Sequence, residues 1–197
     1  MIEFLVGSGL ATAAGLNAWM PLLVLGLADR LVPAIELPAA WAWLSSDVAL
    51  WIIGALLVIE IVADKVPVVD TVNDAVQTVI RPASGGIAFG AGAGAETMRV
   101  EDPAALFADG SWVPVAVGVG IALAVHIAKA LFRPAANAAT AGVAAPIVST
   151  VEDAASLILS VLALVVPILA VLLIIAGVVT VVVLVRRRRR ARARQRT

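Results

Sequence analysis

The chain has 197 residues, of which 62% are hydrophobic and only 14% are charged, and its mean hydropathy is +1.05. A soluble domain of this size contains about 25% charged residues, so the composition excludes an ordinary water-soluble globular protein. Cysteine is absent, which excludes disulfide bonds, thiolate metal sites and cysteine nucleophiles. The long apolar runs instead predict an integral membrane protein, because a helix needs about 20 mostly apolar residues to cross a bilayer.

The net charge of zero conceals an uneven distribution along the chain. Residues 186–197 contain eight arginines and no acidic residue, which leaves residues 1–185 acidic. A basic tail of this kind is not readily translocated, so we predict one transmembrane domain over residues 1–185 and a cytoplasmic tail over 186–197. The tail is also suited to contact anionic lipid headgroups, and no nucleic-acid partner is predicted. The residues predicted to anchor it at the membrane are Arg186, Arg187, Arg188, Arg189 and Arg190.

The first predicted span covers Phe4–Leu27, and the segment Gly15–Pro21 interrupts it with glycine, asparagine and proline. This composition predicts a broken or kinked helix. No basic region precedes the span, so we expect it to be retained rather than cleaved as a signal peptide. An outer connection over residues 29–47 then leads to a second span, Val48–Ala63.

Residues 68–80 differ from the apolar segments around them. Their polar side chains recur at helical spacings, as Asp70, Asn73, Asp74 and Gln77. This spacing predicts an amphipathic helix, which we expect to end at Arg81-Pro82. A short third span rich in glycine follows over residues 83–95, and part of the amphipathic helix is expected to lie in the membrane with it.

The second half of the chain begins with a predicted polar loop over residues 96–112. A fourth span over residues 113–131 carries His126, the only histidine. Small residues predict a weak span over 135–148, and the last helix is expected over 154–185. With 32 residues this helix exceeds the bilayer core, so it must tilt, kink at its proline or protrude.

Six crossings with both termini in the cytoplasm place most lysines and arginines of the connections on the inner side. We therefore predict an all-α fold, a polytopic transmembrane helix bundle of about six spans with broken helices. The predicted location is the inner (plasma) membrane, with the protein passing through it several times.

The segment Pro67–Val76 is similar to Pro146–Ala155, with six identical residues in ten. With six crossings, one copy lies at the inner face and the other at the outer face. This arrangement is typical of a three-plus-three inverted repeat, here over residues 1–98 and 112–185. The alternative is chance similarity in a chain rich in valine and alanine.

Acidic and amide side chains beside helix breaks are the candidate functional groups, because they suit binding of a hard cation or relay of a proton. The main candidates are Asn17, Asp70, Asn73, Asp74 and Asp153, followed by Glu60, Asp64, His126 and Glu152. Each also has a structural interpretation, such as a solvated polar face, an ion pair, a helix cap or an interfacial histidine. No cofactor is predicted, and the identity of any metal is left open.

Three segments, Gly15–Pro21, Ala63–Asp74 and Arg81-Pro82, resemble a bacterial membrane-protein family catalogued as domain of unknown function 4126. Ser149–Asp153 is similar to a second signature of that family. The likeness covers roughly residues 8–170. It implies an integral membrane protein and points to the same polar residues, but it implies no activity.

These features favour a small transporter or channel for a cation, a proton or a small solute, working as a homo-oligomer. The alternative is a non-transporting membrane scaffold or accessory subunit that packs against a partner. An enzyme is not predicted, because no catalytic grouping of residues stands out.

Overall fold

The computed structural model describes residues 1–94, 112–140 and 143–194, and these ranges contain seven α-helices, one short 3-10 helix and no strand. The α-helices are α1 (Ile2–Leu16), α2 (Met20–Leu31), α3 (Asp47–Ala63), α4 (Pro67–Ala93), α6 (Trp112–Thr140), α7 (Ala144–Val165) and α8 (Pro167–Arg194), and η1 (Ala42–Ser45) is the 3-10 helix. The all-helical prediction is confirmed for this part of the chain. Of the predicted loop over 96–112, only Trp112 is described, and it begins α6.

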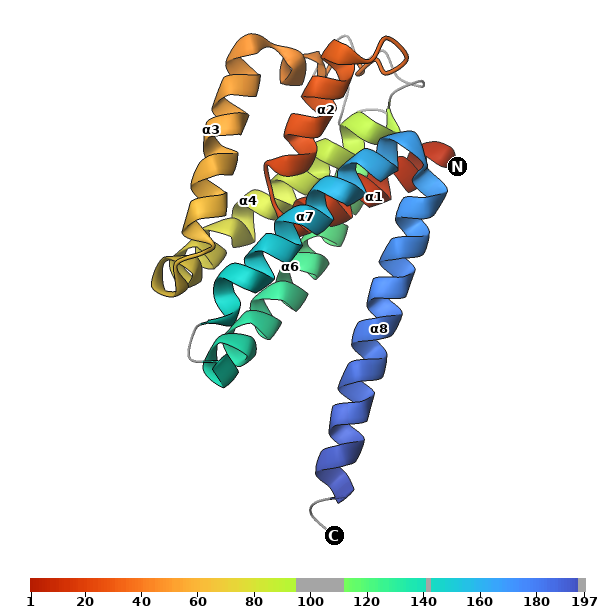
Figure 1. Cartoon of the computed structure of the whole chain (residues 1–197). Coiled ribbons are helices and arrows are strands. Elements are labelled where there is room, and N and C mark those ends of the chain that lie inside the picture. Colours follow the sequence, from red (N-terminus) through yellow and green to blue (C-terminus); the bar gives the residue numbers. More distant parts are fainter. Residues whose placement is uncertain (95–111, 141–142, 195–197) are drawn as a thin grey trace.

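The first predicted span is broken, as its sequence indicates. α1 ends at Leu16, α2 begins at Met20, and the chain changes direction between them (Figure 1). The helix predicted for the second span is α3, which begins one residue earlier than expected. The hydroxyl of Ser46 accepts a hydrogen bond from the backbone N–H of Ala49 at 3.2 Å, which is the usual N-cap that fixes a helix start.

α4 corrects the predicted division between an amphipathic helix over 68–80 and a separate span over 83–95. The helix is continuous, with Pro82 inside it. A proline in a helix interior removes one backbone hydrogen bond and favours a kink or an end. In this case α4 contacts α1 and α6 on both sides of Pro82, and this packing outweighs the local preference.

The second half of the chain also differs from the prediction. The expected span over 135–148 does not exist as one helix, because residues 135–140 end α6 and residues 144–148 begin α7. The expected last helix is divided at Val166, where the backbone leaves the helical conformation with φ −140° and ψ 73°. The residue before a proline is disfavoured in helical conformation, so Pro167 explains the division.

Glycines allow α1, α4 and α6 to pack with their backbones close together. A Cβ atom at Gly118 of α6 would collide with the backbone of Gly85 on α4, and a Cβ at Gly7 of α1 would collide with the ring of Phe89. Close approach through small residues is typical of helices packed in membranes. These three helices therefore form the tightest part of the bundle and hold the polar groups described below in fixed positions.

The helix directions place both copies of the internal similarity at the same end of the bundle. α4 and α7 each run antiparallel to α1. Near the start of α1, Gly7 lies beside Phe89 of α4 and Gly9 lies beside Ala163 of α7. Near its end, α1 is contacted by residues earlier in the same two helices, Arg81 and Asp153. α4 and α7 are therefore parallel to each other. The expected inverted repeat, with copies at opposite faces, is not seen, because Pro67–Val76 and Pro146–Ala155 both begin helices that point the same way.

Two segments within the described helices are long and apolar enough to cross a membrane, judged by length and composition: Trp112–Arg133 and Ala145–Val165. Two further apolar helices are shorter, Ile2–Leu16 and Pro167–Thr180. This finding agrees with a membrane protein, although a count of six crossings goes beyond it. α8 contacts the bundle near its start and then extends away from it (Figure 1).

Candidate functional site

The break between α1 and α2 is capped by the side chain of Asn17. Its Oδ1 atom accepts hydrogen bonds from the backbone N–H groups of Trp19 at 3.1 Å and Met20 at 3.0 Å. This arrangement starts α2 in the manner of a helix N-cap. The Nδ2 atom of Asn17 donates to Oδ1 of Asp153 on α7 at 2.9 Å. Both polar atoms of this fully buried side chain therefore have protein partners.

The carbonyl groups near the break accept hydrogen bonds from side chains of three other helices. The donor and acceptor pairs are Arg81 Nη1 to Gly15 (3.2 Å), Lys129 Nζ to Leu16 (3.0 Å), Ser156 Oγ to Ala13 (2.9 Å), and Ser84 Oγ to Ala18. A buried backbone group without a partner costs about 1–3 kcal/mol. The break is therefore stable because α4, α6 and α7 supply the donors that a continuous helix would supply itself.

Glu60, one turn before the end of α3, connects that helix to the break. Its Oε2 atom accepts a hydrogen bond from the backbone N–H of Ala18 at 3.2 Å, and its Oε1 atom lies 2.8 Å from Nη2 of Arg81. The side chains of Glu60 and Arg81 are 1% and 0% exposed. Removing two charges from water costs several kcal/mol for each, so this pair persists only because each charge neutralises the other.

Asp64, which follows the last residue of α3, has three charged partners. Its Oδ2 atom lies 3.5 Å from Arg81, 3.2 Å from Lys129 and 3.0 Å from Arg133, and its Oδ1 atom accepts a hydrogen bond from Asn73 at 2.7 Å. Burial alone would raise the pKa of Asp64, but the three cations together lower this pKa below its ordinary value of 3.8. Asp64 is therefore an anion that holds the cations of α4 and α6 together.

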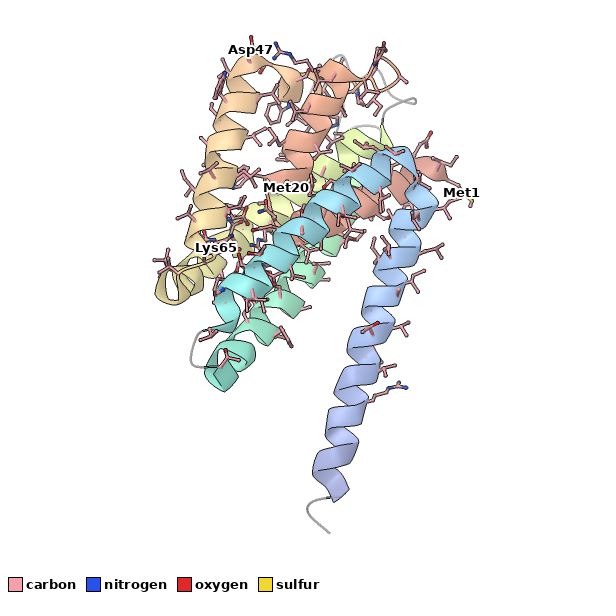
Figure 2. The ribbon with its side chains drawn as sticks, in the orientation of Figure 1. Met1, Met20, Asp47 and Lys65 are labelled. Carbon is pink, nitrogen blue, oxygen red and sulfur yellow. The ribbon has the colours of Figure 1, made fainter. Side chains whose placement is uncertain are left out.

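Two acids of α7 complete the arrangement. Oε2 of Glu152 lies 3.1 Å from Nζ of Lys129 and 2.5 Å from Nη2 of Arg133, and Oδ2 of Asp153 lies 3.5 Å from Nζ of Lys65. Side chains with nitrogen and oxygen atoms gather beside Lys65 in Figure 2. Seven of the charged residues are joined by ion pairs, and the Lys65–Asp153 pair lies beside them. We call all nine charged residues the ion network: Glu60, Asp64, Lys65, Asp74, Arg81, Lys129, Arg133, Glu152 and Asp153.

Asp74 lies at the edge of the ion network, on α4. Its Oδ1 atom is 3.9 Å from Nη1 of Arg133 and has no hydrogen-bond partner within the described residues. The hydroxyl of Thr78 donates its one proton to the backbone carbonyl of Asp74 at 2.9 Å, so it accepts from Nε2 of His126 at 3.0 Å. We therefore assign the proton of His126 to Nε2, which leaves Nδ1 as a buried acceptor without a partner.

Most of the predicted site residues are brought together. Asn17 meets Asp153, Asn73 meets Asp64, and the less favoured candidates Glu60, Asp64 and Glu152 are central to the ion network. Asp70 lies in the first turn of α4, but its side chain is not among those that the structure describes. The same holds for Arg187–Arg190, whereas Arg186 is exposed.

The cations of the ion network were missed as site residues. The sequence analysis treats Lys129 and Arg133 as markers of the cytoplasmic side and Arg81 as part of a helix end, yet all three are at most 5% exposed. One signal could have identified two of them. His126, Lys129 and Arg133 follow at intervals of three and four residues, which places them on one face of an otherwise apolar helix.

The mixture of charges limits what the site can bind. Within the described residues, no group of three histidine, aspartate or glutamate side chains is arranged to hold a metal ion. Cations occupy the positions between the carboxylates instead. An arrangement of alternating charges suits the exchange of ion-pair partners or the movement of a proton rather than the coordination of a hard cation.

These features define a helical bundle that is organised around a broken helix and a buried ion network, with helices apolar enough to cross a membrane. The family described as "Domain of unknown function (DUF4126)" matches residues 4–187, and the chain belongs to this family. The match includes the break, the whole ion network and the apolar part of α8. No curated protein and no solved structure matches the chain.

Proposed function

We propose that the chain is a multi-pass protein of the inner (plasma) membrane that moves a proton, another small cation or a small solute through its helix bundle. The observation that carries this proposal is the ion network beside the break between α1 and α2. Ionisable groups inside membrane helices are costly and are found mainly along ion or substrate pathways. Broken helices line such pathways in many transporters.

An apolar exterior around this charged interior supports the placement in a membrane. The outer face of α3 exposes 81% of Trp51, 60% of Val58 and 62% of Ile59. α8 exposes apolar side chains from Ile168 to Val183. Soluble proteins show the opposite distribution, with charged groups outside and apolar groups inside. Lipid is the solvent that suits these exposed faces.

We propose that the arginine-rich tail lies in the cytoplasm and contacts anionic lipid headgroups there. α8 runs from Pro167 towards the end of the bundle where the α3–α4 and α6–α7 connections lie (Figure 1). These connections, with Lys65 and Arg133 nearby, then share the cytoplasmic side with the tail. The N-terminus lies at the other end of the bundle, so this topology replaces the one with both termini in the cytoplasm.

Because the chain contains no cysteine, single cysteines can test this topology directly. Val66→Cys in the α3–α4 turn and Val143→Cys in the α6–α7 turn are expected to react with a membrane-impermeant thiol reagent from the same side of oriented vesicles. Ala42→Cys, in the connection between α2 and α3, should react from the opposite side. Labelling of Val66→Cys and Val143→Cys from opposite sides would contradict the proposed topology.

Transport itself is tested with the purified full chain in liposomes that contain a fluorescent indicator for H⁺, Na⁺ or K⁺. We expect a flux above that of empty liposomes, and Asp153→Asn should reduce it to the empty-liposome rate because Lys65 loses its anion beside the break. Asp47→Asn, in an exposed ion pair with Arg30, is the matched control and should leave the flux unchanged. Equal flux in Asp153→Asn and Asp47→Asn would reject the ion network as the pathway.

The alternative function is a membrane scaffold or accessory subunit, and one observation favours it. The backbone groups at the break already have protein partners, as a purely structural device would require. In that case the exposed apolar faces of α3 and α8 would bind a second copy of the chain or another subunit. Absence of flux, together with a stoichiometric complex by mass measurement in detergent, would establish this alternative.

A further inference from the structure

The charges of the ion network do not balance when every group is ionised. The described side chains include five carboxyl groups and four cationic groups. Four of the carboxyl groups can each be assigned a different cation within 3.5 Å, as Glu60 with Arg81, Asp64 with Lys129, Glu152 with Arg133, and Asp153 with Lys65. Asp74 is the remaining carboxyl group. An unbalanced charge in a buried cluster is unfavourable, and a proton is the simplest ion that removes it.

A second observation marks the same place. Nδ1 of His126 is a proton acceptor without a hydrogen-bond partner, in a side chain that is only 1% exposed. Nε2 of the imidazole is connected to the backbone carbonyl of Asp74 through the hydroxyl of Thr78. Oδ1 of Asp74 is also buried and without a hydrogen bond. Two buried proton-binding atoms without hydrogen-bond partners therefore belong to residues that Thr78 joins, at the edge of the ion network.

We infer that Asp74 carries an exchangeable proton, which makes the ion network electrically neutral. The inference rests on the proposed function and identifies H⁺ as the transported or coupling ion. When the proton leaves, the O–H bond of the carboxyl group breaks, its electron pair stays on the carboxylate, and the proton passes to water at the exposed edge of the side chain, which is 16% exposed. The network then has one excess negative charge, located beside Arg133.

Loss of the proton changes the contacts of Arg133. Nη1 of this side chain lies 3.9 Å from Asp74, while Nη2 is in contact with Asp64 and Glu152. An ionised Asp74 attracts the guanidinium group more strongly, so the 3.9 Å distance shortens and the contact with Glu152 on α7 weakens. Protonation of Asp74 on α4 is thereby coupled to the position of α7. A proton-driven carrier needs a coupling of this kind.

The charged groups that face Asp74 explain why it, rather than His126, holds the proton. Lys129 and Arg133 approach from α6, Arg81 lies two turns along α4, Asp64 lies at the end of α3, and Glu152 faces from α7. A proton on His126 would place a new positive charge three residues from Lys129. A proton on Asp74 creates no charge and needs no new counter-ion.

Infrared difference spectroscopy across a pH titration tests the inference on the purified full chain, with no transport required. At pH values where exposed carboxyl groups are already ionised, the wild type and the surface control Asp47→Asn should still show the C=O band of a protonated carboxylic acid, which shifts in D₂O and disappears as the pH rises further. Asp74→Asn should lack this band throughout that pH range. Asp74→Glu should restore a band at a shifted frequency, which keeps the test decisive if Asp74→Asn folds poorly by circular dichroism.

Three results would overturn the inference. They are a band that survives in Asp74→Asn at pH values where exposed carboxyl groups are ionised, a wild type without the band in that range, and an imidazolium signal that titrates instead and is lost in His126→Gln. The proposed function is judged separately by the liposome flux. A titrating Asp74 band without any ion flux supports the proton site and rejects transport. Ion flux without the band supports transport and rejects the proton site.

Discussion

Replacement of Arg81 by methionine is expected to lower the free energy of unfolding by about 3–5 kcal/mol, as observed when one partner of a buried ion pair is removed. The variant leaves Glu60 buried without its cation and leaves the carbonyl of Gly15 without its donor. Unfolding of the detergent-solubilised chain, followed by circular dichroism against denaturant concentration, measures the effect. The loss should be large enough to shift the unfolding midpoint well below that of the wild type.

Two further variants test whether the buried ion pair is the cause of this loss of stability. The double variant Glu60→Met with Arg81→Met should recover part of the lost stability, because no unpaired charge then remains buried. Arg30→Met removes a cation from the exposed pair with Asp47 and should cost less than about 1 kcal/mol. Equal losses in Arg81→Met and Arg30→Met would show that the Arg81–Glu60 pair does not hold the break together.

The second large effect is expected for Asp64→Asn, which keeps the size of the side chain but removes the anion between Arg81, Lys129 and Arg133. The three cations then repel one another, and we expect a loss of about 3–5 kcal/mol in the same unfolding measurement. Asp47→Asn again serves as the exposed control, with an expected change below about 1 kcal/mol.

The pH dependence of stability gives an independent check on Asp64. A carboxyl group whose pKa is lowered by folding stabilises the native state at pH values above its ordinary pKa of 3.8, and this contribution is lost as the pH falls through the lower folded-state pKa. The wild type should therefore lose stability more steeply than Asp64→Asn in that acidic range. Parallel pH profiles for the two proteins would show that Asp64 is not the anion holding these cations.

The elements that the sequence predicts well are those with strong local signals. The break near Asn17 follows from glycine, asparagine and proline close together, and α3 follows from the apolar run over Val48–Ala63. The prediction failed at Pro82 because contacts with α1 and α6 come from residues far away in the sequence. It failed over 135–148 because small residues carry little periodic signal that separates a helix from a turn.

The candidate site was predicted in part for a similar reason. Acidic and amide residues beside helix breaks are conspicuous in an apolar chain, so Asn17, Asp74 and Asp153 could be selected from the sequence. Which cation neutralises which acid depends on the order and direction of the packed helices. The Lys65–Asp153 pair, for example, joins residues 88 positions apart and requires both turns to lie at one end of the bundle, contrary to the inverted arrangement. Sequence spacing alone does not contain that information.

The hydrogen bonds at the break have a consequence for the synthesis of the protein. α1 and α2 leave the ribosome before α3, α4, α6 and α7, yet the backbone groups at their junction find partners 42, 66, 113 and 143 residues later in the chain. The final donor, Ser156, belongs to α7, so the junction is completed only after that helix has been made. In the proposed membrane location, the junction until then has exposed polar backbone that lipid cannot satisfy, and the translocation machinery must shelter it.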